Sequence, residues 1–492
     1  MHDEPRPADA PTRPSPSPSP SPSPSPERPG LLALLFGTSA PVDRPTYAKV
    51  GAALMLLKYG LDAGLIYATT GHVWMPYEYL SPALSTRTAI LEGGNELVLA
   101  LLVVLTLPFL WIGLSMSLRR AVDAGKPATL ALLFLVPGLN YLLMLLLAAL
   151  PSAPPKDWRR AAAELHPRGK ILAALYGILA GLGLAVGLTL FATLVVGTYG
   201  SMLFFVTPGL IGAFASWFFN RDAKRGLGAS IGVASLAIAI AGASLLLFAI
   251  EGAICLMMAM PIALVLGIIG AVLGRSMAAF TRSAVTHLLI VGAAMPALMA
   301  VEAGTAAPLR EREVATSVVI DASPAAVWPN VVGFADLDAP PAWIYAAGVA
   351  YPQRARIDGE GVGAVRHCEF TTGAFVEPIT AWEPGRRLAF DVDSQPPPMH
   401  EWSPYKHVHP PHLDGYLRSR RGEFRLIDLG DGRTRLEGST WYTLDLGPST
   451  YWALWSDALI HGIHGRVLEH IKGLSERGHV SVPAARDDVR LD

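Results

Sequence analysis

The sequence has few cysteines and few charges, and each shortage excludes a class of protein. Only two cysteines, Cys255 and Cys368, occur among 492 residues, and they provide neither a CxxC pair nor a disulfide framework. Charged residues make up 16% of the chain, with a formal net charge of -1 and the basic residues scattered in short loops. Because nucleic-acid binding requires a concentrated basic surface, we expect no nucleic-acid partner. The sequence indicates no cofactor.

Apolar sequence, in contrast, is abundant. Hydrophobic residues make up 51% of the chain, and about eight stretches approach the roughly 20 residues that a spanning helix needs. We therefore predict a multi-pass integral membrane protein of the bacterial inner (cytoplasmic) membrane, with the lipid bilayer as a partner. The stretches are residues 47–68, 96–118, 128–150, 170–196, 201–219, 229–250, 253–273 and 284–299.

Changes in composition divide the chain into regions. Residues 14–26 alternate Ser and Pro, which favours extended polyproline II structure and prevents a packed core. No full signal peptide follows them. After Gly304 the sequence changes from nearly uncharged to charged and alternating, which marks a domain boundary. The expected regions are a disordered tail and linker (1–44), a first membrane region (45–150), a basic loop (151–169), a second membrane region (170–304), an α+β domain (305–478) and a tail (479–492).

The basic loops give a consistent orientation only if one hydrophobic stretch turns back. Lys and Arg accumulate in cytoplasmic loops, yet basic loops flank both ends of residues 128–150. These loops share one side if the stretch re-enters at Pro137 and Gly138, where surrounding protein must shield its backbone. We favour this hairpin, which puts the N-terminal tail in the cytoplasm and the C-terminal domain outside. Eight spans without a re-entrant segment would place some basic loops outside the cytoplasm, against this positive-inside rule.

Two opposite charges occur inside the first predicted span. Lys58 and Asp62 lie four residues apart, so they share a helix face and neutralise each other. Either charge alone would cost about 2.5–3.5 kcal/mol at the bilayer centre. The pair is either a structural ion pair or part of a transport or proton pathway.

The first membrane region contains a recurring sequence pattern. Residues 118–143 read LRRAVDAGKPATLALLFLVPGLNYLL, in which a span ends in two basic residues and a later apolar run contains Pro. This pattern resembles a widespread family of small bacterial inner-membrane proteins of unknown function. Val122 stands where that family usually has His, and the resemblance implies no activity. The matching residues are Arg119, Arg120, Asp123, Gly125 and Pro137.

The C-terminal region has the alternation of an antiparallel sheet followed by one long helix. Residues 313–321 alternate like a strand, and Ser323 and Pro324 then favour a helix start. A long amphipathic helix is expected over residues 449–476. Further strands are expected at residues 349–357, 362–371, 375–382, 387–392, 416–426 and 434–444.

The order of these predicted strands and helices, together with four short motifs, resembles a known superfamily. The segment VVIDASPAAVWPNV at 318–331, the GVG turn at 361–363, WEPGRRL at 382–388 and GRTRL at 432–436 resemble the START-like, birch-pollen-allergen-like helix-grip superfamily (SRPBCC). That superfamily includes polyketide cyclase/dehydrase and lipid-transport proteins. The resemblance implies a curved antiparallel sheet around a long C-terminal helix, with a cavity between them for a lipid or another apolar small molecule.

Several residues are candidates for that cavity. Trp452, Trp455 and Leu459 share one apolar face of the last helix, which either lines a cavity or fills a plain core. Arg418 and Arg420 are predicted to share a strand face with Phe424, where they would attract an anionic headgroup unless water solvates them. The candidate ligand-binding residues are Trp328, Phe370, Trp382, Arg418, Arg420, Phe424, Trp441, Trp452, Trp455 and Leu459.

Polar residues of the same region allow two further chemistries. Asp457, His461 and His464 are candidate acids or bases on the last helix. A Pro-rich loop carries histidines without regular ligand spacing or an HExxH motif, so we expect a rigid cover and no metal. The weak metal candidates are His400, His407, His409 and His412.

These features lead to three functional hypotheses. The first is a membrane-anchored module that sequesters, senses or transfers an apolar ligand. The second is a cyclase- or dehydratase-like enzyme that uses the same cavity. The third is a transporter regulated by its soluble domain, which only Lys58 and Asp62 support. Neither the ligand nor the oligomeric state can be predicted from the sequence.

Overall fold

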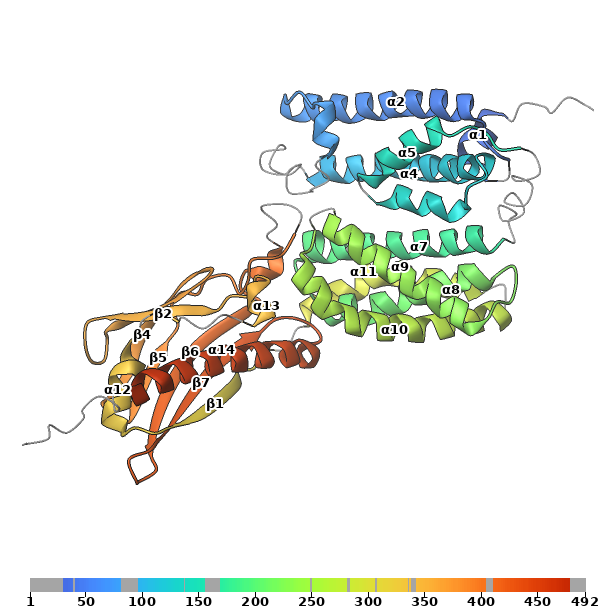
Figure 1. Ribbon diagram of the computed structural model, residues 1–492. Coiled ribbons are helices and arrows are strands. Elements are labelled where there is room, and N and C mark those ends of the chain that lie inside the picture. Colours follow the sequence, from blue (N-terminus) through green and yellow to red (C-terminus); the bar gives the residue numbers. More distant parts are fainter. Residues whose placement is uncertain are drawn as a thin grey trace, which may run out of the picture.

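The computed structural model has a helical region with an α+β domain at one end (Figure 1). It describes residues 30–38, 40–80, 96–136, 138–154, 169–247, 250–280, 284–305, 308–334, 336–337, 342–403 and 410–477. Six helices in this part of the chain are long and apolar enough to cross a membrane. The predicted fold class is therefore confirmed, whereas the predicted Pro/Ser-rich tail and most of the basic loop lie outside the described residues.

The first membrane region begins with a short helix and two long ones. The Asp43 side chain accepts a hydrogen bond from Thr46 N at 3.0 Å, which caps α2, and Gly71 ends that helix with a φ of 72°. The elements are α1 (Leu31–Phe36), α2 (Arg44–Thr70), η1 (Pro76–Leu80) and α4 (Glu96–Asp123).

The next apolar stretch is broken in the middle. It forms a 3-10 helix, η2 (Ala128–Leu135), and then a separate helix, α5 (Leu139–Ala149). Gly138 between them has a φ of 83°, a value that favours glycine. Neither piece reaches the roughly 20 residues that a spanning helix needs.

A buried arginine ties the C-terminal end of this broken stretch to the end of α4. Arg120, at the end of α4, donates to the carbonyl oxygens of Leu147 at 3.0 Å and of Leu150. Ala153 N also donates to Asp123 O at 2.8 Å. The stretch therefore returns to the end of α4, close to where it began, which is the arrangement that a re-entrant hairpin requires.

The second membrane region is a bundle in which glycines allow close helix contacts. A Cβ atom at Gly177 of α7 would lie 2.5 Å from Ala215 O of α8, and one at Gly212 of α8 would lie 2.0 Å from Gly267 O of α10. Small residues at such positions let backbones touch. The elements are α7 (Lys170–Leu190), η4 (Phe191–Val196), η5 (Met202–Val206), α8 (Thr207–Asn220), α9 (Leu227–Leu247), α10 (Ala253–Phe280) and α11 (Ala284–Gly304).

This packing predicts a selective effect of glycine substitution. We expect Gly212→Ala to destabilise the bundle by about 1–3 kcal/mol, because the new methyl group meets backbone that has no room to move. Gly183→Ala is the matched control, since no atom lies within 4 Å of its added Cβ. It should be neutral or gain up to about 1 kcal/mol from helix propensity. Apparent melting temperatures in detergent test the pair, and equal values would contradict the prediction.

The soluble domain is one antiparallel sheet wrapped around a helix. Its seven strands are arranged in the order β1-β7-β6-β5-β4-β3-β2, so the first and second strands form the edges. Val467, Leu468 and Ile471 of α14 pack against sheet residues such as Ile320 and Leu436. The elements are β1 (Arg312–Ile320), α12 (Pro324–Val332), α13 (Trp343–Ala346), β2 (Pro352–Asp358), β3 (Val365–Phe370), β4 (Gly373–Glu383), β5 (Arg387–Asp391), η6 (Pro411–Leu413), β6 (Leu417–Asp428), β7 (Thr434–Leu444) and α14 (Ser449–Arg477).

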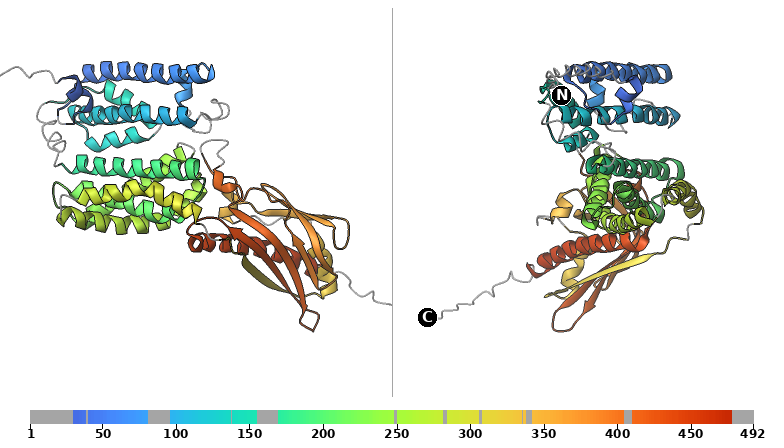
Figure 2. Two further views of the ribbon diagram at one scale, coloured as in Figure 1. Left: turned by 180° about the vertical axis from the view of Figure 1, so that it is seen from behind. Right: turned by 90° about the vertical axis from the view of Figure 1, so that its right-hand side faces the viewer.

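The soluble domain rests on one end of the second bundle (Figure 2). Gly447 N donates to Tyr199 O, and Ala253 N, at the start of α10, donates to Trp402 O, both at 2.9 Å. The Tyr416 hydroxyl donates to Gly197 O at 2.9 Å. These contacts bring residues of the membrane region into the same space as the open end of the sheet.

Candidate functional site

One cavity extends from the sheet of the soluble domain into the helical bundle. Its volume is about 330 Å³, and its walls come from both parts of the chain. Protein sites for small molecules occupy roughly 300–1,000 Å³ and are mostly apolar with a few polar groups. The cavity therefore has the size and the composition of a small-molecule site.

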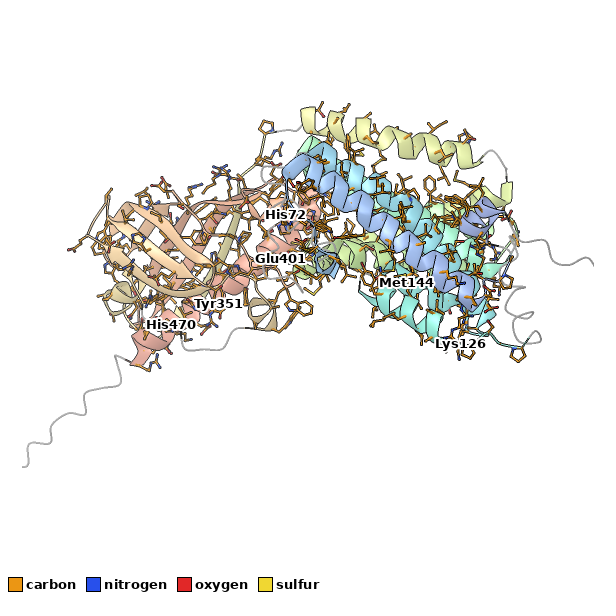
Figure 3. The ribbon with its side chains drawn as sticks, turned by 90° about the horizontal axis from the view of Figure 1, so that it is seen from above. His72, Lys126, Met144, Tyr351, Glu401 and His470 are labelled. Carbon is orange, nitrogen blue, oxygen red and sulfur yellow. The ribbon has the colours of Figure 1, made fainter. Side chains whose placement is uncertain are left out.

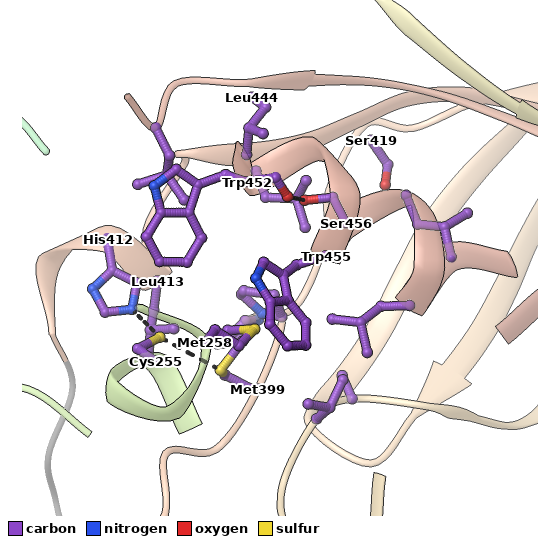
Figure 4. A pocket seen from close by; sticks show the side chains of 18 of the residues that line it. Cys255, Met258, Met399, His412, Leu413, Ser419, Leu444, Trp452, Trp455 and Ser456 are labelled. Carbon is purple, nitrogen blue, oxygen red and sulfur yellow. Dashed lines mark hydrogen bonds between the residues drawn. The ribbon is translucent and has the colours of Figure 1, made fainter. Parts of the chain in front are cut away.

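The wall on the soluble side is formed by the first turns of α14 and by the inner face of the sheet. Trp452, Trp455 and Leu459 line the cavity from α14, as Figure 4 shows for the two tryptophans. Phe370 of β3 and Phe424 of β6 line it from the sheet. Five of the ten predicted ligand-binding residues thus meet around one space.

The wall on the membrane side reaches well below the helix ends. Ile238 of α9 lines the cavity about 14 Å along the axis from Leu247, the last residue of that helix. Ala185 of α7, Ile211 of α8 and Ala259 of α10 complete this wall. The lower part of the cavity thus lies within helices that are long and apolar enough to span a bilayer.

A buried ion pair forms part of the sheet wall. Arg366 of β3 and Glu377 of β4 are directly paired in the register, and their side chains are in contact. The guanidinium also lies 5.1 Å from the ring centroid of Phe390 and 5.5 Å from that of Phe424. Burial raises the pKa of the Glu377 carboxyl, while Arg366 opposes that rise. The pair therefore places two ionisable groups beside the aromatic side chains Phe390 and Phe424 in this wall.

A second polar cluster lies at the junction of the two parts (Figure 4). The Sγ atom of Cys255, in the first turn of α10, is 2.8 Å from Nε2 of His412. Glu401 accepts hydrogen bonds from the backbone N–H groups of Ile254 and Cys255 at 3.0 and 3.2 Å. Figure 3 labels Glu401 at this junction.

A further carboxylate contacts the other side of the same histidine. Glu251 Oε2 lies 3.4 Å from Nδ1 of His412, and Glu251 Oε1 accepts a hydrogen bond from the Tyr199 hydroxyl at 2.8 Å. Burial raises the pKa of Glu251 to about 8. Cys255, His412, Glu251 and Tyr199 all line the cavity, so this cluster and the apolar walls enclose one space.

The comparisons with known proteins cover the two ends of the chain separately. Residues 36–157 match a family described as a protein of unknown function (DUF805). That region contains α2, α4 and the broken hairpin, and it agrees with the membrane-protein family that the 118–143 pattern resembles. No curated protein matches the chain.

Solved structures resemble the soluble part. The Zhui aromatase/cyclase from Streptomyces sp. R1128 is 19% identical, with 35% of this chain and 98% of that chain covered and a TM-score of 0.23. A point mutant of norcoclaurine synthase from Thalictrum flavum is 13% identical, with 35% and 99% covered and a TM-score of 0.25. The decisive observation is the antiparallel sheet that curves around α14. The C-terminal domain has the helix-grip fold.

Arg418 and Arg420 lie on the outer face of the helix-grip sheet, so the prediction that they face the cavity is wrong. Both are exposed. The register between β6 and β7 shifts between Ser419 and Arg421. One extra residue in a strand reverses the side of the sheet to which each later side chain points. Phe424 therefore points inward, although strict alternation along the sequence would put it on the same side as the two arginines.

Three predicted tryptophans also lie away from the cavity. Trp328 of α12 and Trp382 of β4 pack edge to face with ring centroids 5.6 Å apart. Trp441 of β7 lies under Arg421, whose guanidinium is 4.1 Å from its ring centroid. None of the three is among the lining residues in the described part of the chain. They contribute to packing at other places in the domain.

The three candidate acid–base residues make contacts within the helix-grip domain. Asp457 accepts hydrogen bonds from Arg312 at 3.0 Å and from the Tyr442 hydroxyl at 2.5 Å. His461 Nδ1 lies 2.8 Å from Thr316 Oγ1. His464 lines the cavity, and its Nε2 lies 2.8 Å from Thr440 Oγ1. These contacts connect α14 to β1 and β7.

His464 predicts a pH dependence of stability. Burial, reinforced by His461, lowers the pKa of His464 from 6.5 to about 4. Between these values the unfolded chain binds a proton that the folded chain excludes, so the folded form loses stability as pH falls from 6.5 to 4. At pH 5 the loss is about 1–2 kcal/mol. The apparent melting temperature should fall less from pH 7 to pH 5 in His464→Gln than in the natural protein, and equal falls would contradict the assignment.

The remaining predicted residues fall into separate places. Lys58 and Asp62 form the expected ion pair on α2, and neither belongs to the cavity wall. His400 is exposed, whereas His412 is buried in the junction cluster. His407 and His409 lie outside the described residues.

Sequence reasoning missed most of the polar groups around the cavity. Cys255, Glu251 and Glu401 come together with His412 only because α10 starts beneath the helix-grip domain. One signal was present: Glu251 is the sole charged residue between Arg225 and Arg275, and it separates two apolar stretches. A lone carboxylate in that position usually needs a partner.

Proposed function

We propose that this protein binds an apolar, lipid-like molecule in the cavity shared by its helix-grip domain and its membrane helices. The molecule would pass between the bilayer and the soluble domain without crossing water. One observation carries the proposal: residues of α7 to α10 and residues of the sheet and α14 line the same cavity. A soluble carrier protein would need only the residues of the sheet and of α14.

The composition of the walls supports an apolar ligand with a small polar end. Aromatic and aliphatic side chains surround most of the cavity, and two polar clusters lie in its wall, Arg366 with Glu377 and Cys255 with His412. Burial of apolar area gives roughly 25 cal/mol per Å², and a few polar contacts fix orientation. A lipid, polyketide or sterol fragment has this division of polarity.

We also propose that the helix-grip domain lies on the extracytoplasmic side. Lys170, Arg221, Arg225 and Arg275 lie at the helix ends far from that domain, and Arg275 Nε donates to Arg225 O at 3.0 Å. Basic ends of this kind face the cytoplasm in most membrane proteins. A reporter enzyme that is active only outside the cytoplasm should be active when it is fused after Asp492. If only a reporter that is active inside the cytoplasm works at that position, this orientation is contradicted.

The two other hypotheses have less support. Asp457 and His461 make contacts that suit a structural role, which leaves an enzyme without those two acid–base groups. Lys58 and Asp62 lie outside the shared cavity, so a transport pathway through them would be separate from the helix-grip domain.

A charge in the aromatic wall tests the binding proposal. We expect Trp455→Glu to reduce the apolar ligand that co-purifies with the full-length protein by at least about tenfold, because an unpaired carboxylate in the wall costs more than about 1.4 kcal/mol. Leu454→Glu is the matched control, since the neighbouring Leu454 is 69% exposed. Mass spectrometry of organic extracts gives the amounts. Equal retention in both folded variants would contradict the proposal.

A further inference from the structure

Three side chains that commonly ligate metals converge at the junction cluster. Cys255 Sγ lies 2.8 Å from His412 Nε2, which lies 4.0 Å from Glu401 Oε1. The three ligand atoms all lie within 4.8 Å of one another. Zinc bonds of about 2.0–2.3 Å in a tetrahedron place ligand atoms roughly 3.4–3.6 Å apart. Shifts of under about 1 Å would therefore bring the two measured separations to that geometry.

A carboxylate lies beside the second ring nitrogen of this histidine, where metal-binding histidines usually have one. Glu251 Oε2 lies 3.4 Å from Nδ1, and the Tyr199 hydroxyl donates to the other Glu251 oxygen at 2.8 Å. A carboxylate on one imidazole nitrogen fixes the tautomer and leaves the other nitrogen as a ligand. Here that other nitrogen is Nε2, which points to Cys255 (Figure 4).

The ligating groups of this cluster are also buried together. Glu251 and His412 are 6% and 8% exposed, and the Glu401 side chain is 0% exposed, so water solvates these groups poorly. A divalent cation bound among Cys255, His412 and Glu401 would displace the thiol and carboxyl protons and would compensate the negative charges that these ligands then carry.

We propose that Cys255, His412 and Glu401 bind a zinc ion, with Glu251 positioning His412. Thiolate and imidazole ligands favour zinc over magnesium or calcium. Because Cys255 and His412 line the cavity, a fourth coordination position would face the ligand. Zinc with an open position polarises a carbonyl or hydroxyl oxygen. The metal site goes beyond ligand binding and does not depend on it.

A thiol nucleophile is the competing interpretation of the same atoms. A cysteine beside a histidine that is backed by a carboxylate also describes a nucleophile with its base. The N–H groups of Ile254 and Cys255 at the start of α10, which would serve such a nucleophile, donate instead to Glu401 at 3.0 and 3.2 Å. A carboxylate at that position opposes a free thiolate and suits a metal ligand, so the geometry favours zinc.

The test measures metal binding by the full-length protein in detergent. After removal of metal with a chelator, we expect the natural protein to bind one equivalent of Zn²⁺, measured by elemental mass spectrometry. Co²⁺ in its place should give a thiolate-to-cobalt charge-transfer band. Cys255→Ser and His412→Gln should lose the ion, whereas the controls Cys368→Ser and His400→Gln should keep it. Glu251→Gln should bind Zn²⁺ about 10–100-fold more weakly.

Three results would overturn the zinc site. The first is substoichiometric Zn²⁺ with no charge-transfer band in the natural protein, a result that requires no variant to fold. The second is unchanged Zn²⁺ binding in Cys255→Ser or His412→Gln. The third is rapid, His412-dependent alkylation of Cys255 by iodoacetamide that Zn²⁺ does not slow, which would assign the nucleophile instead.

Discussion

Ala259→Trp is expected to reduce the co-purified apolar ligand at least about tenfold. Ala259 lines the cavity from α10, on the membrane side, and its small side chain leaves space that an indole would occupy. A ligand that loses about 60 Å² of buried apolar area loses roughly 1.5 kcal/mol, which already corresponds to about a tenfold loss of affinity. Mass spectrometry of extracts from the full-length protein gives the ratio.

The control for this prediction lies on the same helix. Val265 of α10 is 59% exposed, so Val265→Trp adds the same side chain outside the cavity. This variant should retain the ligand, because a tryptophan on the outer surface of the bundle takes no space from the cavity. Full retention in a folded Ala259→Trp variant would show that the membrane-side wall does not contact the ligand.

The second large effect concerns stability. Arg366→Met is expected to destabilise the helix-grip domain by about 3–5 kcal/mol, because it leaves the buried Glu377 carboxyl without its partner. For a domain of this size that corresponds to a fall of roughly 10 °C in melting temperature. Tryptophan fluorescence during heating of the full-length protein measures it.

The double variant distinguishes the cause. Arg366→Met together with Glu377→Leu removes both charges and should recover most of the lost stability, since an apolar pair of similar volume is often as stable as a buried ion pair. If the double variant is as unstable as Arg366→Met alone, the loss comes from altered packing against Phe390 and Phe424 and not from an unpaired charge.

The fold was largely predictable because its signals are local. Apolar stretches of spanning length gave the membrane helices, and alternation with turn residues gave the strands. The tryptophan stripe on α14 was also readable, because Trp452, Trp455 and Leu459 recur at helical spacing. The broken hairpin could be inferred from the basic loops on both sides of residues 128–150, since charge placement reports topology.

The site was less predictable because it depends on register and on distant contacts. The shift between Ser419 and Arg421 reversed the predicted face of Arg418 and Arg420, and single-sequence alternation does not reveal such a bulge. Cys255 and Glu401 are separated by 146 residues and meet only after the helix-grip domain docks on the bundle. The same docking creates the membrane-side wall.

The most direct measurement of the central claim is photo-crosslinking from both walls of the cavity. A photoreactive amino acid replaces either Leu245 of α9 or Leu459 of α14 in the full-length protein, and mass spectrometry identifies the adducts formed in membranes. Leu236 of α9, which is 42% exposed, controls for bulk lipid. The shared cavity predicts the same small-molecule adduct at Leu245 and Leu459. An adduct at Leu245 that matches only the Leu236 control, with none at Leu459, would contradict it.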